Sequence, residues 1–414
     1  MYLSVINISG TAGTLFAQDA ESIYMSMMLA GQTGTGIMDI DIPIIRHIDD
    51  VLPHIEGKPE FIVIDKGDYK VIDYVYTDKD TFDNPYALEC RGIKFNSKGE
   101  IIARPFHKFF NVGEKQQVED IDLSNNHVIM EKLDGSMIHA CMVNGELVLM
   151  TRKGHTDVAM QAEMAFLGQD RYVRFITELL ERGFTPIFEY TAPNNRIVIE
   201  YAIPSLTLLA VRDMGCGDYM NYNMLYIWAQ EYNVPVVMEY RFDKDPNLSY
   251  TGHMMNILEM TRTLKDKEGF VIQFHSGHML KMKADEYVRK HRAIDSTSSK
   301  KRAVELIIND GIDDILPMLS DKDKQALIGL NSAVHETINS KASFIEQIVL
   351  THNASGMDRK HMALNIVPTA KMRNGDWIAS CIFSHLDGDD AKQLVTAAIL
   401  KNPSIVKCEW RGEV

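Results

Sequence analysis

The segment that most constrains the fold is Glu131-Lys132-Leu133-Asp134-Gly135-Ser136, because it places a short polar turn between two apolar runs. Val128–Met130 precedes it and Met137–Val143 follows it, and both runs are typical of β-strands. The sequence therefore predicts that a lysine, an aspartate and a glycine lie together at a tight turn between two strands.

A lysine at such a turn has two interpretations. At the reference lysine pKa of about 10.4, only roughly one molecule in a few thousand is a free amine at neutral pH. A nucleophilic lysine therefore needs burial or nearby positive charge to lose its proton. If the chain supplies a phosphate substrate, a metal and further cations, Lys132 is a candidate nucleophile; if not, it is a surface residue in a hairpin.

Two glutamates further along the chain are candidates for a charged site. Glu189 lies inside the apolar run 186–190, and a buried carboxylate must be paired, bind a metal or have a shifted pKa. Glu268 and Gly269 begin a predicted strand that ends at residue 274.

The predicted strand 279–283 carries two lysines. Lys281 and Lys283 are two residues apart, so they project from one face while Leu280 and Met282 face the core. This pair is a candidate cradle for a polyphosphate, and the alternative is a solvated strand face.

Three further cations precede the turn 131–136 in the sequence. Residues 88–95 and 101–106 are predicted strands, and Arg91, Arg104 and Lys108 are interleaved there with aromatic residues. Either their stems pack on the edge of the core, or they form a surface that binds phosphate and stacks a base.

The remaining periodicity predicts a mixed α and β organisation. Further strands are expected at 61–65, 69–76, 146–151, 197–201 and 206–212, and helices at 158–182 and 220–232. Ser296–Ser299 is the best candidate for a linker, and the pattern beyond it is helical.

Composition excludes several classes of protein. A net charge of −14 argues against a generally basic nucleic-acid coat, although a local basic groove is compatible with it. The five dispersed cysteines indicate reduced thiols rather than a disulfide framework or a zinc site. No segment is apolar enough to span a bilayer, so we expect no membrane partner, and the reduced thiols indicate a cytoplasmic location.

The order of these motifs resembles the covalent nucleotidyltransferase superfamily of ATP-dependent ligases and mRNA-capping enzymes. The upstream blocks narrow the resemblance to the bacteriophage tRNA-repair RNA ligases of the RNA ligase 1 family. The residues that carry it are Glu89–Ile93, Arg104-Pro105, Lys108–Asn111, Lys132-x-Asp134-Gly135, Glu189, Pro193–Val198, Glu268-Gly269 and Lys281-x-Lys283.

The resemblance implies an α+β fold in three parts. A nucleotidyltransferase (ATP-grasp-like ligase adenylation) domain of antiparallel sheets with flanking helices would span 81–293. An all-α C-terminal domain at 300–414 would help to choose the tRNA. Residues 1–80 would be an N-terminal extension or a subdomain of the adenylation domain.

The resemblance also implies the reaction and its partners. Lys132 would take AMP from ATP, AMP would pass to the 5′-phosphate of an RNA, and a 3′-hydroxyl would then seal the strand and release AMP. The expected cofactor is Mg²⁺ or Mn²⁺, the expected RNA is a tRNA cleaved in its anticodon loop, and the expected enzyme is a monomer.

The resemblance assigns site residues by position. The catalytic set is Lys132, Lys281, Lys283 and Glu268, and metal ligands, directly or through water, are Asp134, Glu189 and Glu268. The nucleotide-binding set is Arg91, Lys108, Phe110, Glu131, Gly135, Lys153, Glu189, Glu268, Lys281, Lys283 and Tyr287.

Three alternatives share part of this pattern. A DNA ligase and an mRNA-capping-type guanylyltransferase both normally carry an OB-fold after the Lys-x-Lys strand, and the helical pattern beyond residue 295 disfavours them. A non-enzymatic tRNA-binding protein would have a broken motif, whereas every residue of the motif set is intact here.

Overall fold

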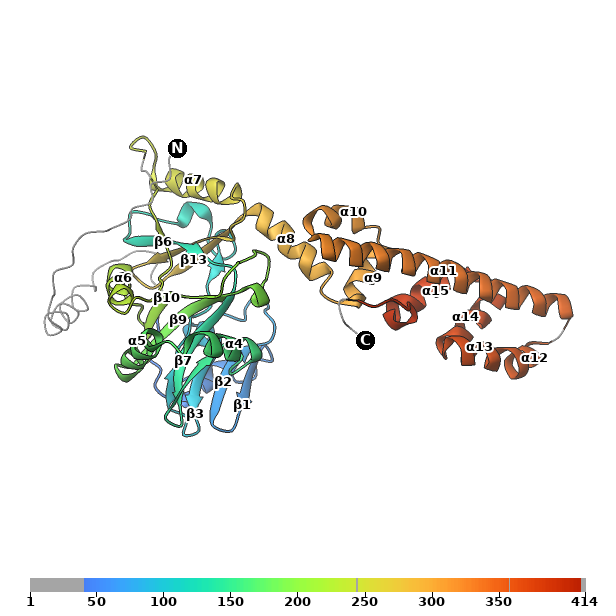
Figure 1. Cartoon of the computed structure of the whole chain (residues 1–414), viewed down its shortest axis with the longest axis horizontal. Helices are drawn as coiled ribbons and strands as arrows, with labels where there is room; N and C mark the ends of the chain where they lie inside the picture. Colours follow the sequence, from blue (N-terminus) through green and yellow to red (C-terminus); the bar gives the residue numbers. More distant parts are fainter. Residues whose placement is uncertain (1–40, 243–244, 357, 411–414) are drawn as a thin grey trace. The chain divides into compact units, whose positions relative to one another are not determined.

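The computed structural model describes residues 41–242, 245–356 and 358–410 (Figure 1). Half of the expected N-terminal part, residues 1–40, therefore lies outside the described residues. The chain divides into two compact units between Tyr287 and Val288. This division falls inside helix α8 (Asp285–Ser296), ahead of the serine-rich segment 296–299.

The first unit is built on three mainly antiparallel sheets. The first sheet has the order β1 (Phe61–Asp65), β2 (Tyr69–Tyr74), β3 (Ile93–Asn96), β4 (Ile101–Ala103). The second has the order β10 (Ser205–Asp213), β9 (Phe184–Thr191), β7 (Ser136–Val143), β8 (Glu146–Met150). The third has the order β11 (Glu239–Tyr240), β6 (His127–Lys132), β12 (Gly269–Phe274), β13 (Met279–Lys283), β5 (Phe110–Asn111).

Each sheet is covered by helices of its own. The first sheet packs on η1 (Ile48–Asp50), α2 (Leu52–Ile55) and α3 (Pro85–Glu89). The second packs on α4 (Asp157–Phe166), α5 (Asp170–Glu181) and α6 (Tyr222–Glu231), and the third on η2 (Val118–Asp120) and α7 (Tyr250–Arg262). The short helix η3 (Pro193–Asn195) follows β9.

The inner faces of the first two sheets also meet each other. Val71 and Ala103 of the first sheet pack against Cys141 and Met150 of the second, and all four are buried. This contact brings the loops at the ends of β3 and β8 together, which positions part of the site described below.

The predicted strand at 88–95 is wrong over its first residues. Asn84 caps a helix there, since its Oδ1 accepts a hydrogen bond from Ala87 N at 2.9 Å, and Pro85 occupies the first turn. Asparagine at the N-cap and proline at the first helical position both favour a helix start, so α3 forms before β3 begins at Ile93.

Two other predicted elements differ from the structure. The predicted helix at 158–182 is two helices, α4 and α5, separated at Gly168 and Gln169. Met164, an apolar residue of α4, is 87% exposed. The predicted strand at 197–201 is a loop, because the backbone N–H groups of Val198 and Ile199 donate to a carboxylate instead of to a neighbouring strand.

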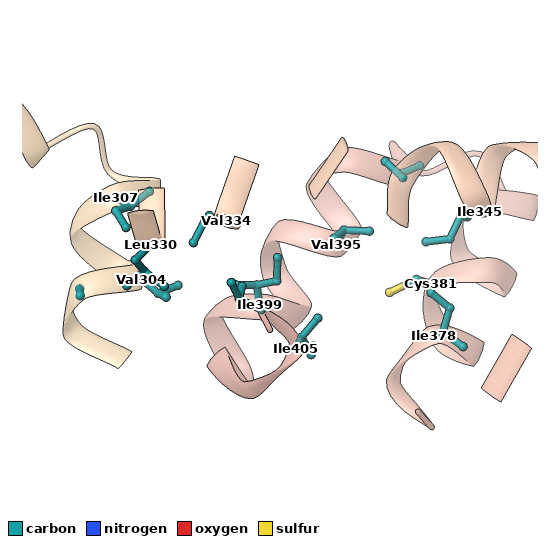
Figure 2. Packing of buried hydrophobic residues seen from close by; sticks show 14 of the residues in the cluster. Val304, Ile307, Leu330, Val334, Ile345, Ile378, Cys381, Val395, Ile399 and Ile405 are labelled. Atoms are coloured by element: carbon teal, nitrogen blue, oxygen red, sulfur yellow. The ribbon is translucent and has the colours of Figure 1, made fainter. Parts of the chain in front are cut away.

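The second unit is helical, as the periodicity predicted. Its elements are α9 (Lys300–Ile308), α10 (Ile312–Ile315), η4 (Leu316–Met318), α11 (Asp321–Ser355), α12 (Arg359–His361), η5 (Met362–Ile366), α13 (Val367–Asn374), α14 (Trp377–Leu386), α15 (Ala391–Lys401) and η6 (Pro403–Ile405). One apolar core joins most of these elements, and α11 contributes Leu330, Val334 and Ile345 to it (Figure 2).

The sheets of the first unit and the helices of the second unit confirm the α+β fold class. Among the described residues, no helix combines the length and the hydropathy that crossing a membrane requires.

Candidate functional site

The polar turn at Lys132 connects two different sheets. Lys132 is the last residue of β6 in the third sheet, and Ser136 is the first residue of β7 in the second sheet. The hairpin alternative is therefore wrong, because the strands on either side of the turn do not pair with each other. The turn lies where the two sheets adjoin.

Strand register places Lys132 of β6 level with Lys283 of β13, with one strand, β12, between them. Gly269 of β12 is paired with Lys132 of β6 on one side and with Lys283 of β13 on the other. A Cβ at Gly269 would lie 2.0 Å from Met282 O, and the residue has a φ of +148°. Only glycine allows the strands to approach this closely at the point where both lysines emerge.

The carboxylate of Glu268 joins the two lysines. Its Oε1 lies 2.8 Å from Lys132 Nζ and 2.9 Å from Lys283 Nζ, and its side chain is 4% exposed. Two ammonium groups thus share one buried oxygen, so the site concentrates positive charge around a single carboxylate.

Lys281 extends the same positive cluster. Burial, followed by the charges of Lys108, Lys132, Lys283 and Arg91, lowers its pKa to about 8. Leu280 and Met282 are buried in the core, as the alternation predicted, whereas Lys281 and Lys283 are partly exposed.

Phe110 reaches the cluster through an additional strand. It lies in β5, which pairs in parallel with β13 and sets Phe110 opposite Leu280. Lys108 Nζ lies 5.4 Å from the centre of the Phe110 ring and 5.3 Å from the centres of both the Tyr74 and Phe82 rings. The structure thus surrounds this ammonium with three aromatic rings.

Arg91 has an unsatisfied buried donor. Its Nη1 has no hydrogen-bond partner among the described residues, although its guanidinium acts electrostatically on Lys281 and Asp73. A buried N–H without an acceptor is costly, so this position is suited to an anion that binds from solution.

Glu189 lies on the other side of the lysine turn. Its Oε1 accepts a hydrogen bond from Gly135 N at 3.0 Å. Burial raises its pKa to about 8 against the lowering charge of Lys132, and the charge of Glu268 adds to the rise. A Cβ at Gly135 would lie 2.4 Å from Tyr190 O, so glycine is needed for the turn to approach β9 this closely.

Asp134 holds the turn in place. Its Oδ2 accepts hydrogen bonds from Val198 N at 2.8 Å and Ile199 N at 2.6 Å, and its Oδ1 accepts one from Tyr287 at 2.7 Å. Both carboxylate oxygens are used inside the protein, an arrangement that favours loop ordering over metal binding for Asp134. Tyr287 is placed at the site by this bond.

The remaining carboxylates limit how a metal could bind. Across the described ranges, no group of three or more His, Cys, Asp or Glu side chains is placed to hold a metal ion. Glu189 and Glu268 nevertheless fit a Mg²⁺ ion, which takes few carboxylates and keeps its waters, because both side chains are buried and the charge of Glu268 adds to the rise in the pKa of Glu189.

Glu131 is directed away from Lys132. Neighbouring strand residues alternate in direction, and the Glu131 carboxylate pairs with Lys267 Nζ at 2.8 Å, which also donates to Tyr240. The structure therefore does not bring the Glu131 side chain to the lysine cluster. Nothing in the sequence indicates that Lys267 pairs with Glu131; Lys267 is notable there only as the neighbour of Glu268.

Lys153 and its neighbour Arg152 lie on the turn after β8. Lys153 is exposed, whereas Arg152 Nε pairs with Asp73 Oδ2 at 3.1 Å and its guanidinium lies 4.6 Å from the centre of the Tyr74 ring. Arg152 thus lies beside the Lys108 ring cluster. The sequence does not single out Arg152, because two adjacent cations on a turn give no indication of which one faces inward.

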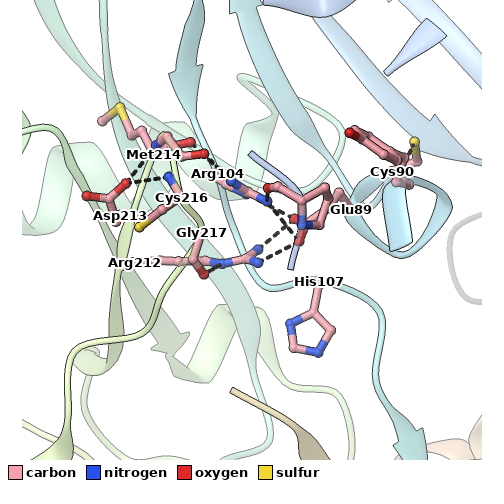
Figure 3. A network of polar contacts seen from close by, with 12 residues as sticks. Glu89, Cys90, Arg104, His107, Arg212, Asp213, Met214, Cys216 and Gly217 are labelled. Atoms are coloured by element: carbon pink, nitrogen blue, oxygen red, sulfur yellow. Dashed lines mark hydrogen bonds and ion pairs between the residues drawn. The ribbon is translucent and has the colours of Figure 1, made fainter. Parts of the chain in front are cut away.

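Arg104 does not belong to the exposed cations. It is fully buried, and it pairs with the Glu89 carboxylate together with Arg212 (Figure 3). The two guanidinium groups lower the pKa of Glu89 to about 2 in spite of its burial. Arg104 therefore forms a buried ion pair, so the phosphate-binding interpretation is wrong for this residue and its side chain lies inside the core rather than on its edge.

Comparison with known proteins identifies relatives of this chain. A family described as "RNA ligase" matches residues 89–287. A Thermovibrio ammonificans protein named "Putative RNA ligase" is 30% identical over 308 residues, which cover 71% of this chain and 78% of that protein. "RNA ligase 1" of bacteriophage TS2126 is 27% identical over 49% of this chain and 51% of its own length.

Solved structures show a more distant likeness. The structure titled "Archaeal ATP-dependent RNA ligase - form 2" aligns with a TM-score of 0.45 and 13% identity over 73% of this chain and 80% of that chain.

Proposed function

This chain belongs to the RNA ligase family, and we propose that it seals RNA strands with ATP through an AMP-lysine intermediate at Lys132. The observation that carries the proposal is the meeting of Lys132 Nζ and Lys283 Nζ at one oxygen of Glu268, at 2.8 and 2.9 Å. A nucleophilic amine and a phosphate-binding ammonium are thereby held within reach of the same reacting group.

In the first step, the free amine of Lys132 attacks the α-phosphorus of ATP. A nitrogen–phosphorus bond forms, the bond from the α-phosphorus to the bridging oxygen breaks, and pyrophosphate leaves with its electron pair. The amine loses its proton, for which Glu268 Oε1 at 2.8 Å is the nearest acceptor. Such displacements at phosphorus depend on positioning and on neutralising charge.

The cations of the site have separate tasks in this step. Lys281 and Lys283 project from one face of β13 and stabilise the negative charge on the phosphate oxygens. Arg91, whose Nη1 has no acceptor among the residues that the structure describes, and Lys108 bind the remaining phosphates of the nucleotide. Phe110 packs against the nucleotide next to Lys108.

Glu189 and Glu268 would hold a divalent cation, Mg²⁺ or Mn²⁺, which supplies positive charge that stabilises the leaving pyrophosphate when bound. Asp134 instead orders the turn that carries Lys132, through its hydrogen bonds to Val198 N, Ile199 N and Tyr287. Gly135 N keeps Glu189 oriented toward the turn.

The later steps reuse the same residues. AMP passes from Lys132 to the 5′-phosphate of an RNA, and a 3′-hydroxyl then displaces AMP and closes the strand. The natural RNA is a tRNA cleaved in its anticodon loop, chosen with the help of the helical domain that begins near residue 300, and the enzyme acts as a monomer. Residues 81–293 form the adenylation domain in this proposal.

The test incubates the protein with a 5′-phosphorylated RNA, ATP and Mg²⁺, and measures closed product on a denaturing gel. We expect sealing of nicked tRNA that Lys132→Ala abolishes, with Lys98→Met as a matched control on the exposed β3–β4 turn. Sealing of DNA ends at a comparable rate would contradict the RNA assignment, and use of GTP instead of ATP would favour the guanylyltransferase alternative.

A further inference from the structure

A buried lysine outside the turn 131–136 has an unusual set of hydrogen-bond partners. Lys94 of β3 has no exposed surface, and its Nζ donates to Gly92 O at 2.6 Å, Thr151 O at 3.0 Å and Arg152 O at 3.3 Å. Lysine is almost never fully buried unless it is paired. Here three backbone carbonyls match the three N–H donors of an ammonium group.

These bonds connect two sheets. Gly92 lies immediately before β3 of the first sheet, whereas Thr151 and Arg152 lie on the turn after β8 of the second sheet. The turn closes on itself, since Thr151 N donates to Gly154 O at 2.9 Å and Gly154 N donates to Thr151 O at 3.0 Å. Lys94 therefore fastens a compact turn to the neighbouring sheet.

The turn packs against the first sheet at two more points. A Cβ at Gly92 would lie 2.5 Å from Arg152 O, so the two backbones are in close contact. At the far end of the turn, His155 N donates to the Tyr69 hydroxyl at 3.1 Å. The position of the turn is thus fixed from both ends, with Lys94 in the middle.

The side chain that this arrangement directs is Arg152. Its guanidinium lies over the Tyr74 ring, and the Lys108 ammonium lies 5.3 Å from the centre of the same ring. Arg152 Nε is held by Asp73, whose other oxygen, Oδ1, is buried without a partner in the part of the chain that the structure describes. The Arg152 side chain as a whole is 31% exposed, so part of it is open to a ligand.

We propose that Lys94 is a positioning residue, whose amine holds the Thr151–Gly154 turn so that Arg152 lies beside Lys108 and binds a phosphate of the nucleotide. The inference rests on the proposed function, because it assigns Arg152 to the same nucleotide site. Lys94 itself is closed off from any ligand and acts only through the turn.

The electrostatic surroundings agree with a closed position for Lys94. Burial lowers its pKa to about 7; the charges of Cys141 and Asp73 oppose this shift and that of Arg152 adds to it. His139, buried nearby, has its pKa lowered by burial and by the charges of Lys94 and Arg91. Burial is thus the largest cause of the lowered pKa of Lys94, and the three carbonyl oxygens accept the N–H groups of the buried amine.

The experiment measures ATP binding by equilibrium dialysis, independently of catalysis, in the full chain and in four variants. Lys94→Met removes the amine at similar length, Arg152→Ala removes the guanidinium, the third variant combines both, and Lys98→Met is the control on an exposed turn of the same sheet. We expect Lys94→Met and Arg152→Ala each to weaken ATP binding about tenfold, the loss that is typical when a residue supporting a ligand contact is removed.

The double variant distinguishes positioning from general damage. If Lys94 acts through Arg152, the double variant binds ATP no more weakly than Arg152→Ala alone. Unchanged ATP binding in Lys94→Met, or losses that multiply in the double variant, would overturn the inference. In Lys94→Met, whose amine does not touch the nucleotide, the loss should appear in ATP affinity more than in the maximal rate of AMP transfer to Lys132 at saturating ATP.

Two further results keep the tests separate. If Lys94→Met does not fold, as judged by circular dichroism, Gly92→Ala displaces the same turn from the other side and must weaken ATP binding in the same way, and normal binding there overturns the inference. If the parent binds ATP but Lys132 takes no label, the proposed function fails while dialysis still decides the role of Lys94. A parent that does not bind ATP contradicts both.

Discussion

Replacing Glu189 with glutamine should stabilise the first unit at alkaline pH. The native state raises the pKa of this carboxyl from 4.5 to about 8, with burial as the largest cause. Between these values the folded chain holds a proton that the unfolded chain has lost, so stability falls as pH rises from about 4.5 to about 8. Glutamine remains neutral throughout and still offers an oxygen to Gly135 N.

The size of the effect follows from the shift of the Glu189 pKa from 4.5 to about 8. A tenfold change in proton affinity is about 1.4 kcal/mol, so the full pKa shift corresponds to about 5 kcal/mol as an upper limit. Local rearrangement and water entry reduce the cost of a buried charge, so we expect Glu189→Gln to be about 2–4 kcal/mol more stable than the parent at pH 8.5 and nearly equal to it at pH 5.

The assay is native-state hydrogen exchange of β7 and β9 amides in increasing urea, which reports the stability of this unit separately from the helical one. Glu146→Gln, at the exposed start of β8, is the matched control and should change stability by less than about 0.5 kcal/mol. A glutamine variant that is less stable than the parent at pH 8.5, or equally more stable at both pH values, would refute the reasoning.

Three other substitutions test different parts of the account. Lys281→Met should stabilise the fold near pH 7 and lose this advantage above about pH 10.5, because the pKa of Lys281 is lowered to about 8, and hydrogen exchange of β13 at the two pH values measures it. Gly269→Ala should slow AMP transfer to Lys132 about 100-fold or more, because its Cβ would overlap Met282 O and displace Lys132 and Lys283. An unchanged rate in a labelling time course would argue against the strand register. Glu89→Gln should destabilise the first unit by about 3–5 kcal/mol in urea denaturation, because it leaves Arg104 and Arg212 buried without their counter-charge; a loss below about 1 kcal/mol would mean that the carbonyl acceptors suffice.

The sequence predicted the elements whose signal is local. The period of two in 279–283 placed Leu280 and Met282 in the core and the two lysines on the other face, and the structure agrees. Asn84-Pro85 is also a local signal for a helix start, and residues 88–92 do not form the predicted strand because this helix occupies 85–89 and β3 begins only at Ile93.

Features that depend on distant contacts could not be predicted. A turn between two apolar runs has the same local pattern whether the strands pair or join different sheets, so the place of Lys132 between sheets was not predictable from its neighbours. The Glu89–Arg212 pair joins residues 123 positions apart, and neither residue carries a local signal of it. The inward direction of Arg152 depends on Lys94, which belongs to another sheet.

The most direct test of the central claim is the covalent label on Lys132. The chain is incubated with α-labelled ATP and Mg²⁺, digested, and the labelled peptide identified by mass spectrometry, with Lys132→Ala and Lys267→Met prepared in parallel. We predict AMP on Lys132, its complete absence in Lys132→Ala, and its retention in Lys267→Met, whose lysine pairs with Glu131 away from the cluster. No label in the parent, or label on another residue that persists in Lys132→Ala, would contradict the account.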